Sequence, residues 1–203
     1  MGLKERKERN REDMRARILK SAHKIFVENG FDDVSIRNIA VDIEYSPATI
    51  YLYFKDKNEI FYALHTEAFK VFNEYVADLV SIKDPFKRLV ALGRKFMAFA
   101  RKYPKYYDIM FITMAPMDCH LNKDKWPEGT KAHAFLEGLV AECKAQGRFK
   151  KLDAQILSLT IWSFVHGLCS LELQNRLRIY PDELQPTITR DSFEQFVKVL
   201  GNL

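Results

Sequence analysis

Two helix-start signals follow one another closely near residues 35 and 46, and they constrain the fold more than any other feature of this sequence. Ser35 is suited to cap a short helix, whose apolar side would be Ile36, Ile39, Ala40 and Ile43. Ser46-Pro47 repeats the signal, because proline is tolerated at the first helical position, and it predicts another short helix at about 47–53. Helices joined by so tight a turn cannot lie antiparallel, so we expect a helix-turn-helix.

The rest of the sequence also indicates helices. Apolar residues recur at helical spacing, and no stretch alternates as a β-strand would. Gly and Pro number only 8 and 7, too few for a turn-rich all-β protein. Start and stop signals predict further helices at about 12–28, 57–80, 85–102, 106–114, 131–146, 153–175 and 192–201. The prediction is therefore an all-α protein of about nine helices.

Two of these helix starts have the spacing of a capping box, in which the cap residue and the residue three positions later bond each other's backbone. They are Asp56 with Glu59, at the start of the longest predicted helix, and Ser192 with Gln195, at the start of the last. Asn29-Gly30 provides the stop of the first helix.

Positive charge is concentrated at the N-terminus. The chain of 203 residues has 32 Lys+Arg and 27 Asp+Glu, a net charge of +5. Residues 1–20 contain eight basic and four acidic residues, whereas residues 21–60 contain four and seven. Residues 1–11 are thus a basic arm that either contacts DNA phosphates or remains a solvated tail. Net charge alone permits a nucleic-acid partner without establishing one.

Several classes of protein are disfavoured. The three cysteines have no short-range pairing, no apolar segment follows the N-terminal charges, and the uncharged run at 155–171 is shorter than a membrane span. We therefore expect a cytoplasmic protein without a membrane partner. Cys119, His120, His133 and Cys143 lack metal-ligand spacing, and no phosphate-binding loop or nucleophile elbow is present. Neither a metal, a cofactor nor an enzymatic activity is expected.

The segments Gly30–Ala40 and Ser46–Ile60 strongly resemble the DNA-binding region of TetR-type repressors, over about residues 12–62. The positions that agree are Gly30-Phe31, Ser35, Ile39-Ala40, Thr49-Ile50-Tyr51, Phe54 and Lys57. The element Trp162-Ser-Phe-Val-His166-Gly167 is similar to one found in a group of TetR-type ligand domains. Beside the basic N-terminal arm (1–11), the resemblance implies a helix-turn-helix domain (12–56) and a helical ligand-binding and dimerisation domain (57–203).

The resemblance also implies which residues meet double-stranded DNA. Small residues at the start of the second motif helix let it enter the major groove, and tyrosine hydroxyls reach the backbone. Residues at the starts of the neighbouring helices hold phosphates. The expected DNA contacts are Ser35, Arg37, Pro47, Ala48, Thr49, Tyr51, Tyr53 and Lys57. Ile50 and Phe54 are expected to face the small core.

Glu44 departs from the family pattern, which usually has glycine at this position of the turn. If the position requires left-handed backbone, glutamate costs about 1 kcal/mol there. Its negative charge would also repel phosphate if it faced DNA.

Aromatic residues and methionines are frequent after residue 63, and together they favour an apolar ligand cavity between helices. Each one alone fits the core better than a pocket, and for Trp162 and His166 the core or a subunit interface is favoured over ligand contact. The candidate ligand residues are Phe72, Phe96, Phe99, Tyr107, Phe111, Met114, Trp162 and His166. They suggest a small hydrophobic or aromatic effector.

The last two helices carry more apolar surface than one core requires, so we expect them to pair between two subunits as a four-helix bundle. The candidate interface residues are Phe164, Leu168, Leu171, Phe193, Phe196, Val197 and Leu200. A homodimer would read two palindromic half-sites.

The predicted function is a ligand-responsive transcriptional regulator, foremost a repressor. The alternatives are an activator on the same scaffold and a helical interaction protein that has lost operator binding.

Overall fold

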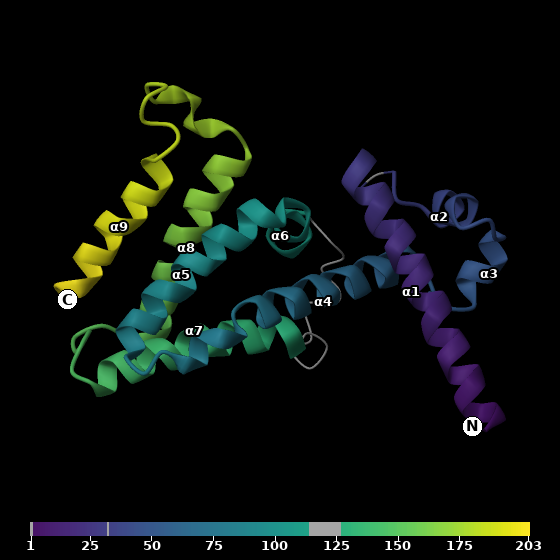
Figure 1. Cartoon of the computed structure of the whole chain (residues 1–203), viewed down its shortest axis with the longest axis horizontal. Coiled ribbons are helices and arrows are strands. Elements are labelled where there is room, and N and C mark those ends of the chain that lie inside the picture. Colours follow the sequence, from purple (N-terminus) through teal and green to yellow (C-terminus); the bar gives the residue numbers. More distant parts are fainter. Residues whose placement is uncertain (1, 32, 114–126) are drawn as a thin grey trace. The chain divides into compact units, whose positions relative to one another are not determined.

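The computed structural model describes residues 2–31, 33–113 and 127–203, and within these ranges it contains helices and no strands (Figure 1). The all-α prediction is confirmed. The α-helices are α1 (Leu3–Asn29), α2 (Ile36–Asp42), α3 (Pro47–Tyr51), α4 (Lys57–Tyr75), α5 (Pro85–Lys102), α6 (Pro104–Phe111), α7 (Pro127–Ala145), α8 (Ala154–Leu173) and α9 (Ile188–Gly201). Two 3₁₀ segments, η1 (Ala77–Ser81) and η4 (Arg176–Ile179), follow α4 and α8.

The chain forms two compact units. Among the described residues, the first comprises 2–31, 33–68 and 108–113, and the second comprises 69–107 and 127–203. We expected a boundary before the long helix, whereas the compact units divide within α4. The reason is that the start of α4 belongs to the first core: the Phe61 ring meets Phe31 edge-on at 4.3 Å and Phe26 at 5.8 Å.

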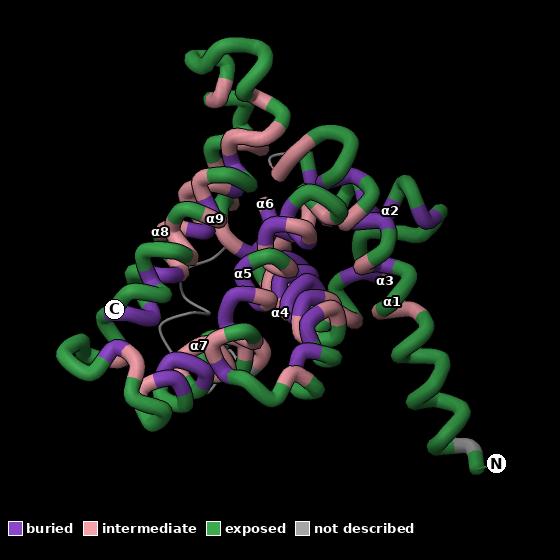
Figure 2. The backbone as a smooth tube through the Cα atoms, turned by 60° about the vertical axis from the view of Figure 1, so that its left-hand side comes forward, coloured by how far each residue is buried: buried purple, intermediate pink, exposed green. Residues whose placement is uncertain are grey.

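The first helix begins nine residues earlier than the expected start near residue 12, so the basic arm is helical. Residues 4–13 are exposed along this extension, which appears green in Figure 2. Lys, Arg and Glu are good helix formers even without a packed face. The Gly2 N–H donates to Glu5 Oε2 at 2.8 Å, which ties down the first turn. A prediction based on apolar spacing overlooks such a helix, because its first three turns have no apolar face.

Other helix boundaries also differ from the prediction. The helix α4 ends at Tyr75 and not near residue 80, because the chain tightens into η1. The helices α6 and α7 begin at Pro104 and Pro127, since proline begins a helix as readily as it ends one. The last helix begins at Ile188, which places Ser192 inside α9, so the expected capping box there is wrong.

In the second unit, α5, α7 and α8 all contact one another, and α9 contacts α8. Gly93 of α5 lies under the ring of Phe193 of α9, where a Cβ would be only 2.6 Å from two ring carbons. The absence of a side chain at Gly93 therefore permits this close approach of α9 to α5.

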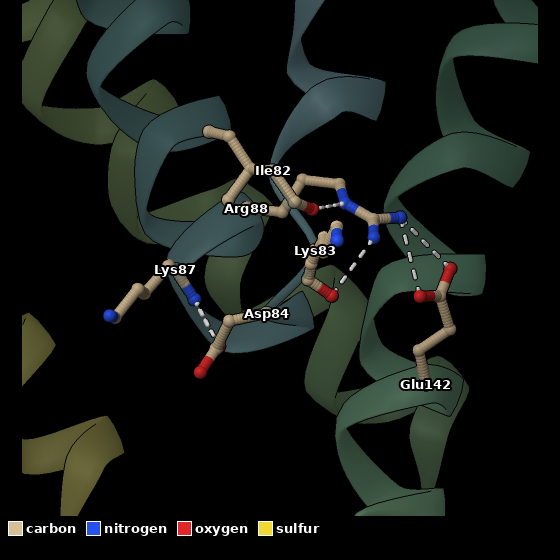
Figure 3. Close-up of polar contacts among 6 residues, drawn as sticks. All are labelled: Ile82, Lys83, Asp84, Lys87, Arg88 and Glu142. Atoms are coloured by element: carbon tan, nitrogen blue, oxygen red, sulfur yellow. Dashed lines mark hydrogen bonds and ion pairs between the residues drawn. The ribbon is translucent and has the colours of Figure 1, made fainter.

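The half-buried Arg88 connects the turn between η1 and α5 to α7 (Figure 3). Arg88 Nε donates to the Ile82 carbonyl at 2.8 Å, and its Nη1 lies 3.3 Å from both carboxylate oxygens of Glu142 on α7. Asp84 caps α5, because its Oδ1 accepts the Lys87 N–H at 2.9 Å. One guanidinium thus joins the start of α5 to α7.

Candidate functional site

Both short helices begin at the expected caps. Ser35 Oγ accepts the Asn38 N–H at 3.0 Å at the start of α2. Ser46 Oγ accepts the Thr49 N–H at 3.2 Å at the start of α3, and Pro47 occupies the first helical position. These two bonds satisfy N–H groups that would otherwise lack helical partners. Local chemistry alone therefore sets where α2 and α3 begin.

The turn between α2 and α3 adopts left-handed backbone at Glu44, where φ is +61°. The Glu44 N–H donates to the Val41 carbonyl at 3.2 Å, and the Tyr45 N–H returns to the Ala40 carbonyl at 2.9 Å. This is the conformation that favours glycine, so position 44 does require the left-handed backbone in which glutamate is strained. Its side chain is exposed.

We expect Glu44→Gly to raise the free energy of unfolding by about 1 kcal/mol, because glycine relieves the left-handed strain. Urea unfolding followed by circular dichroism measures the change. Glu44→Ala is the matched control, since it removes the same charge and keeps the Cβ. Equal stabilisation by alanine and glycine would show that charge, and not backbone strain, is responsible.

The helix α3 has one face in the core and one face in solvent. Ile50 and Phe54 are buried, as expected, whereas Pro47, Ala48 and Tyr51 are exposed. Thr49 and Tyr53 are half-buried. Among the expected DNA contacts, Arg37 on α2 is exposed and Ser35 is half-buried. The hydroxyl of Thr49 lies 3.0 Å from Ser46 Oγ, so it also belongs to the cap of α3.

Two arginines of α1 hold the motif at the ends of its helices. Arg15 donates to the Tyr53 carbonyl just after α3, and its guanidinium lies 4.1 Å above the Phe54 ring. Arg17 Nη2 donates to the Ile43 carbonyl at 2.9 Å, just after α2. A cation at a helix C-terminus meets unpaired carbonyls and the negative end of the helix dipole. Sequence reasoning missed this role because it counted both arginines only as positive charge.

Lys57, an expected phosphate contact, is engaged within its own unit. Its Nζ donates to the Phe31 carbonyl at 2.6 Å and lies 4.1 Å above the Phe31 ring. Lys57 therefore ties the start of α4 to the turn after α1.

The expected capping box at the start of α4 is only half present. Asp56 Oδ1 accepts the Glu59 N–H at 2.9 Å, but Glu59 Oε2 accepts from the N–H of Lys55 instead of Asp56.

Most of the candidate ligand residues form one aromatic cluster in the second unit. Phe72 lies 5.8 Å from Phe96 and 5.1 Å from Phe99 between ring centroids. Tyr107 lies 5.9 Å from Phe96 and stacks on His166 at 5.6 Å, and Trp162 lies 6.4 Å from His166. These six residues are named the aromatic cluster below. Phe111 belongs to the other compact unit, and Met114 lies outside the described residues.

The aromatic cluster contains one polar pair. The Tyr107 hydroxyl lies 2.8 Å from His166 Nδ1 and donates to the His166 carbonyl at 3.2 Å. Both bonds form together when His166 carries its proton on Nδ1. Burial lowers the pKa of His166 and raises the pKa of Tyr107, so both side chains are neutral at pH 7. The pair is therefore a neutral polar element inside an apolar cluster.

A surface depression of about 320 Å³ lies elsewhere in the second unit. It is lined by Glu172, Asn175, Leu177, Arg178 and Gln185. None of these residues belongs to the aromatic cluster, so the depression does not coincide with the expected ligand site.

The candidate interface residues lie on different sides of α8 and α9. Phe193 and Leu200 are buried within the protomer, so neither offers an exposed side chain to a second subunit. Phe193 faces inward because Gly93 of α5 makes room for its ring. Phe164 and Phe196 stack on each other at 4.0 Å. Leu168 and Val197 are half-buried, and Leu171 is exposed.

The helix α8 exposes apolar residues that sequence reasoning did not select. Ile156 is 69% exposed and Leu159 is 54% exposed, and they share a side of the helix with Ser163 and Gly167. Val199 of α9 is also exposed. The signal was present as apolar spacing, but α8 is apolar nearly all round, so spacing does not distinguish its inner face from its outer face.

By length and composition, α8 is the one helix within the described ranges that could cross a membrane, with a mean hydropathy of 1.5 in its most apolar stretch. The helix also contacts α5, α7 and α9, and core helices pass the same test. Only 28% of the stretch is buried within the chain. We therefore interpret its exposed side as a face that lacks a partner in the single chain.

Across the part of the chain that the structure describes, no three His, Cys, Asp or Glu side chains gather as metal ligands would. Cys119 and His120 lie outside that part. Burial raises the pKa of Cys143 to about 11 and that of Cys169 to about 12. Both thiols are thus protonated at neutral pH.

Two family models match the chain. The model described as "Bacterial regulatory proteins, tetR family" matches residues 18–64, and "Tetracyclin repressor-like, C-terminal domain" matches residues 89–200. The HTH-type transcriptional regulator SAB2452 of Staphylococcus aureus (strain bovine RF122 / ET3-1) is 33% identical over 73 residues. That match covers 36% of this chain and 37% of the relative.

Solved structures have the same fold. The regulatory protein SCO4313 has a TM-score of 0.73 at 24% identity, over 95% of this chain and 97% of its own. FadR from Bacillus subtilis, solved with stearoyl-CoA, has a TM-score of 0.70 at 20% identity, over 90% and 97%. AibR, solved with isovaleryl coenzyme A and operator DNA, has a TM-score of 0.61 at 19% identity, over 77% and 85%.

Proposed function

Because this chain belongs to the TetR family of bacterial transcriptional regulators, we propose that it is a cytoplasmic homodimeric repressor that binds a palindromic operator. A hydrophobic or aromatic effector releases it from the DNA. The observation that carries this proposal is the two-sided helix α3, which keeps Ile50 and Phe54 in the core and leaves Pro47, Ala48 and Tyr51 exposed. We assign it no metal, cofactor or catalytic role.

In this proposal α3 enters the major groove. Pro47 and Ala48 at its start are slender enough for close approach, and an alanine methyl suits a thymine methyl. Thr49, Tyr51 and Tyr53 supply hydroxyls to bases or phosphates, while Ser35 and Arg37 meet the backbone at the start of α2. Few of these groups read base edges, so DNA shape carries part of the specificity.

The dimer of the proposal uses the exposed side of α8. Ile156, Leu159 and Leu171 are exposed there, with small residues at Ser163 and Gly167 between them. A Cβ built at Gly167 meets no atom within 4 Å, so a neighbouring helix has room for close approach. A two-fold axis through this stripe would pair α8 and α9 with their copies in a four-helix bundle.

The effector of the proposal acts through the aromatic cluster. Phe96, Trp162 and His166 are only half-buried, and the Tyr107–His166 pair is the polar element that a ligand among these rings would meet. The helix α4 carries both Phe72 and Lys57, so a ligand that displaces Phe72 would act on the helix that holds the motif. It must bind the released state more tightly, because equal affinity shifts no equilibrium.

Two of the structural relatives were solved with acyl-coenzyme A thioesters. We therefore include isovaleryl and stearoyl thioesters, beside simple aromatic acids, among the compounds to test for release of the operator. A compound that acts as the effector should lower the affinity for the operator and raise the midpoint temperature of thermal unfolding of the DNA-free protein.

We expect Tyr51→Ala to weaken operator binding at least about tenfold, a loss of roughly 1.4 kcal/mol. Tyr51 is 58% exposed, so its removal leaves the core intact. A duplex selected by the wild-type protein from a random-sequence library serves as the probe in fluorescence anisotropy. Lys57→Ala is a poorer test because Lys57 also holds the Phe31 carbonyl.

Tyr180→Ala is the matched control, since Tyr180 is also an exposed tyrosine but belongs to the second unit and not to the helix-turn-helix. Unchanged affinity in Tyr51→Ala would remove α3 from the interface. If the wild-type protein selects no duplex at all, the alternative of a helical interaction protein without operator binding is favoured. If the protein does bind an operator, mapping the position of that operator relative to the promoter separates repression from activation.

A further inference from the structure

The packed face of α1 continues beyond its packed residues as a row of cations. Ile18 is buried and Met14 is half-buried against the rest of the first unit. Stepping back along the same side by alternating intervals of three and four residues leads to Arg11, Lys7 and Lys4, all exposed. These three residues are named the cationic row below.

Negative charge avoids this side of the helix. At 100° per residue, Glu5, Glu12 and Asp13 lie on the opposite half of α1, and only Glu8 borders the row. Arg6 and Arg9 share that opposite half, where they face acids of their own helix. The overall charge of the extension is therefore small, while the face that continues the packed side is positive.

The cationic row leads directly to the motif. Arg15 follows Arg11 by one helical turn on the same side, and it donates to the Tyr53 carbonyl at the end of α3. Arg15 is half-buried, so this contact fixes the direction in which the exposed turns leave the first unit. The extension from residue 3 to residue 13 is about 16 Å long at 1.5 Å per residue.

We propose that Lys4, Lys7 and Arg11 bind the phosphates of double-stranded DNA beside the half-site that α3 contacts. This proposal rests on the proposed operator binding and adds a second contact region to it. The three cations span about 10 Å of helix, and a DNA strand presents a phosphate about every 3.4 Å along its axis, so about three phosphates are within reach. Because the row is already helical, binding orders less chain than a flexible arm would.

The test compares two double variants with the same loss of charge in the same exposed turns. Lys7→Gln/Arg11→Gln removes two cations of the row, and Arg6→Gln/Arg9→Gln removes two from the opposite half. Glutamine keeps helix propensity, and circular dichroism checks that both variants retain the wild-type helix content. Affinity for the selected duplex is measured from 0.05 to about 0.3 M salt.

We expect the row variant to lower the slope of log K against log salt by about 1.8 for each bound protomer, or about 0.9 per phosphate contact. Its affinity at 0.1 M salt should fall about tenfold or more. The control variant should lose much less. Equal losses of affinity in both variants would show that the extension attracts DNA only through its general positive charge and not through the cationic row. An unchanged salt slope in the row variant would exclude phosphate contact by Lys7 and Arg11. A wild-type protein that binds no duplex would overturn the proposed function itself.

Discussion

Leu159→Glu should convert the proposed dimer into monomers of 23.8 kDa. Leu159 is 54% exposed on the apolar side of α8, so the substitution leaves the protomer core intact. In a two-fold interface each substituted residue appears twice, and two carboxylates would be buried close together. Burial of unpaired charge costs several kcal/mol, so the substitution opposes dimerisation strongly. Light scattering coupled to size exclusion measures the mass.

Leu184→Glu is the matched control for this experiment. Leu184 is 50% exposed, nearly as much as Leu159, but it lies in the segment between η4 and α9 and not on the α8 stripe. We expect this variant to remain dimeric. A dimeric Leu159→Glu protein would move the interface away from α8, and monomers from both variants would indicate that any added charge disrupts the dimer.

Phe99→Ala should lower the free energy of unfolding by about 3–5 kcal/mol. The Phe99 ring is fully buried and meets Phe72 at 5.1 Å, Tyr103 at 5.2 Å and Tyr75 at 5.7 Å. Truncation removes these contacts and leaves a cavity that the surrounding helices can fill only in part. Urea unfolding of the free protein measures the loss.

Phe96→Ala is the comparison, since Phe96 lies in the same helix but is only half-buried. We expect a smaller loss of stability and a larger effect on the response to an effector. The two variants thereby separate the two roles that the sequence left open for the aromatic residues. A loss below about 1 kcal/mol for Phe99→Ala would show that this part of the cluster is a loosely packed pocket and not a core.

The motif could be predicted from local chemistry because its helix starts depend on neighbouring residues. Ser35 and Ser46-Pro47 act on N–H groups two or three positions away, so their effect is readable along the chain. The left-handed turn at Glu44 is local in the same sense. The expected capping box at Ser192 failed, because helix α9 begins at Ile188, after Thr187, whose side chain makes no capping bond.

The partners of the cations could not be predicted. Arg15, Arg17 and Lys57 reach carbonyls that are 26 to 38 residues distant in the sequence. A long flexible side chain has no periodicity that reveals its partner, and the same charge is consistent with a phosphate, a carboxylate or a helix end.

By itself, the sequence determined that the chain is helical, where the motif helices begin and which face of α3 is buried. These properties follow from propensity, capping and apolar spacing, all of which act within a few residues. Helix propensity also accounts for the helical basic arm, which apolar spacing overlooked. Only the tertiary structure decided which carbonyls Arg15, Arg17 and Lys57 reach. It also decided that Phe193 and Leu200 face inward while Leu159 faces outward. An apolar stripe shows that a helix needs a partner, but the choice between its own chain and a second chain depends on how distant helices pack.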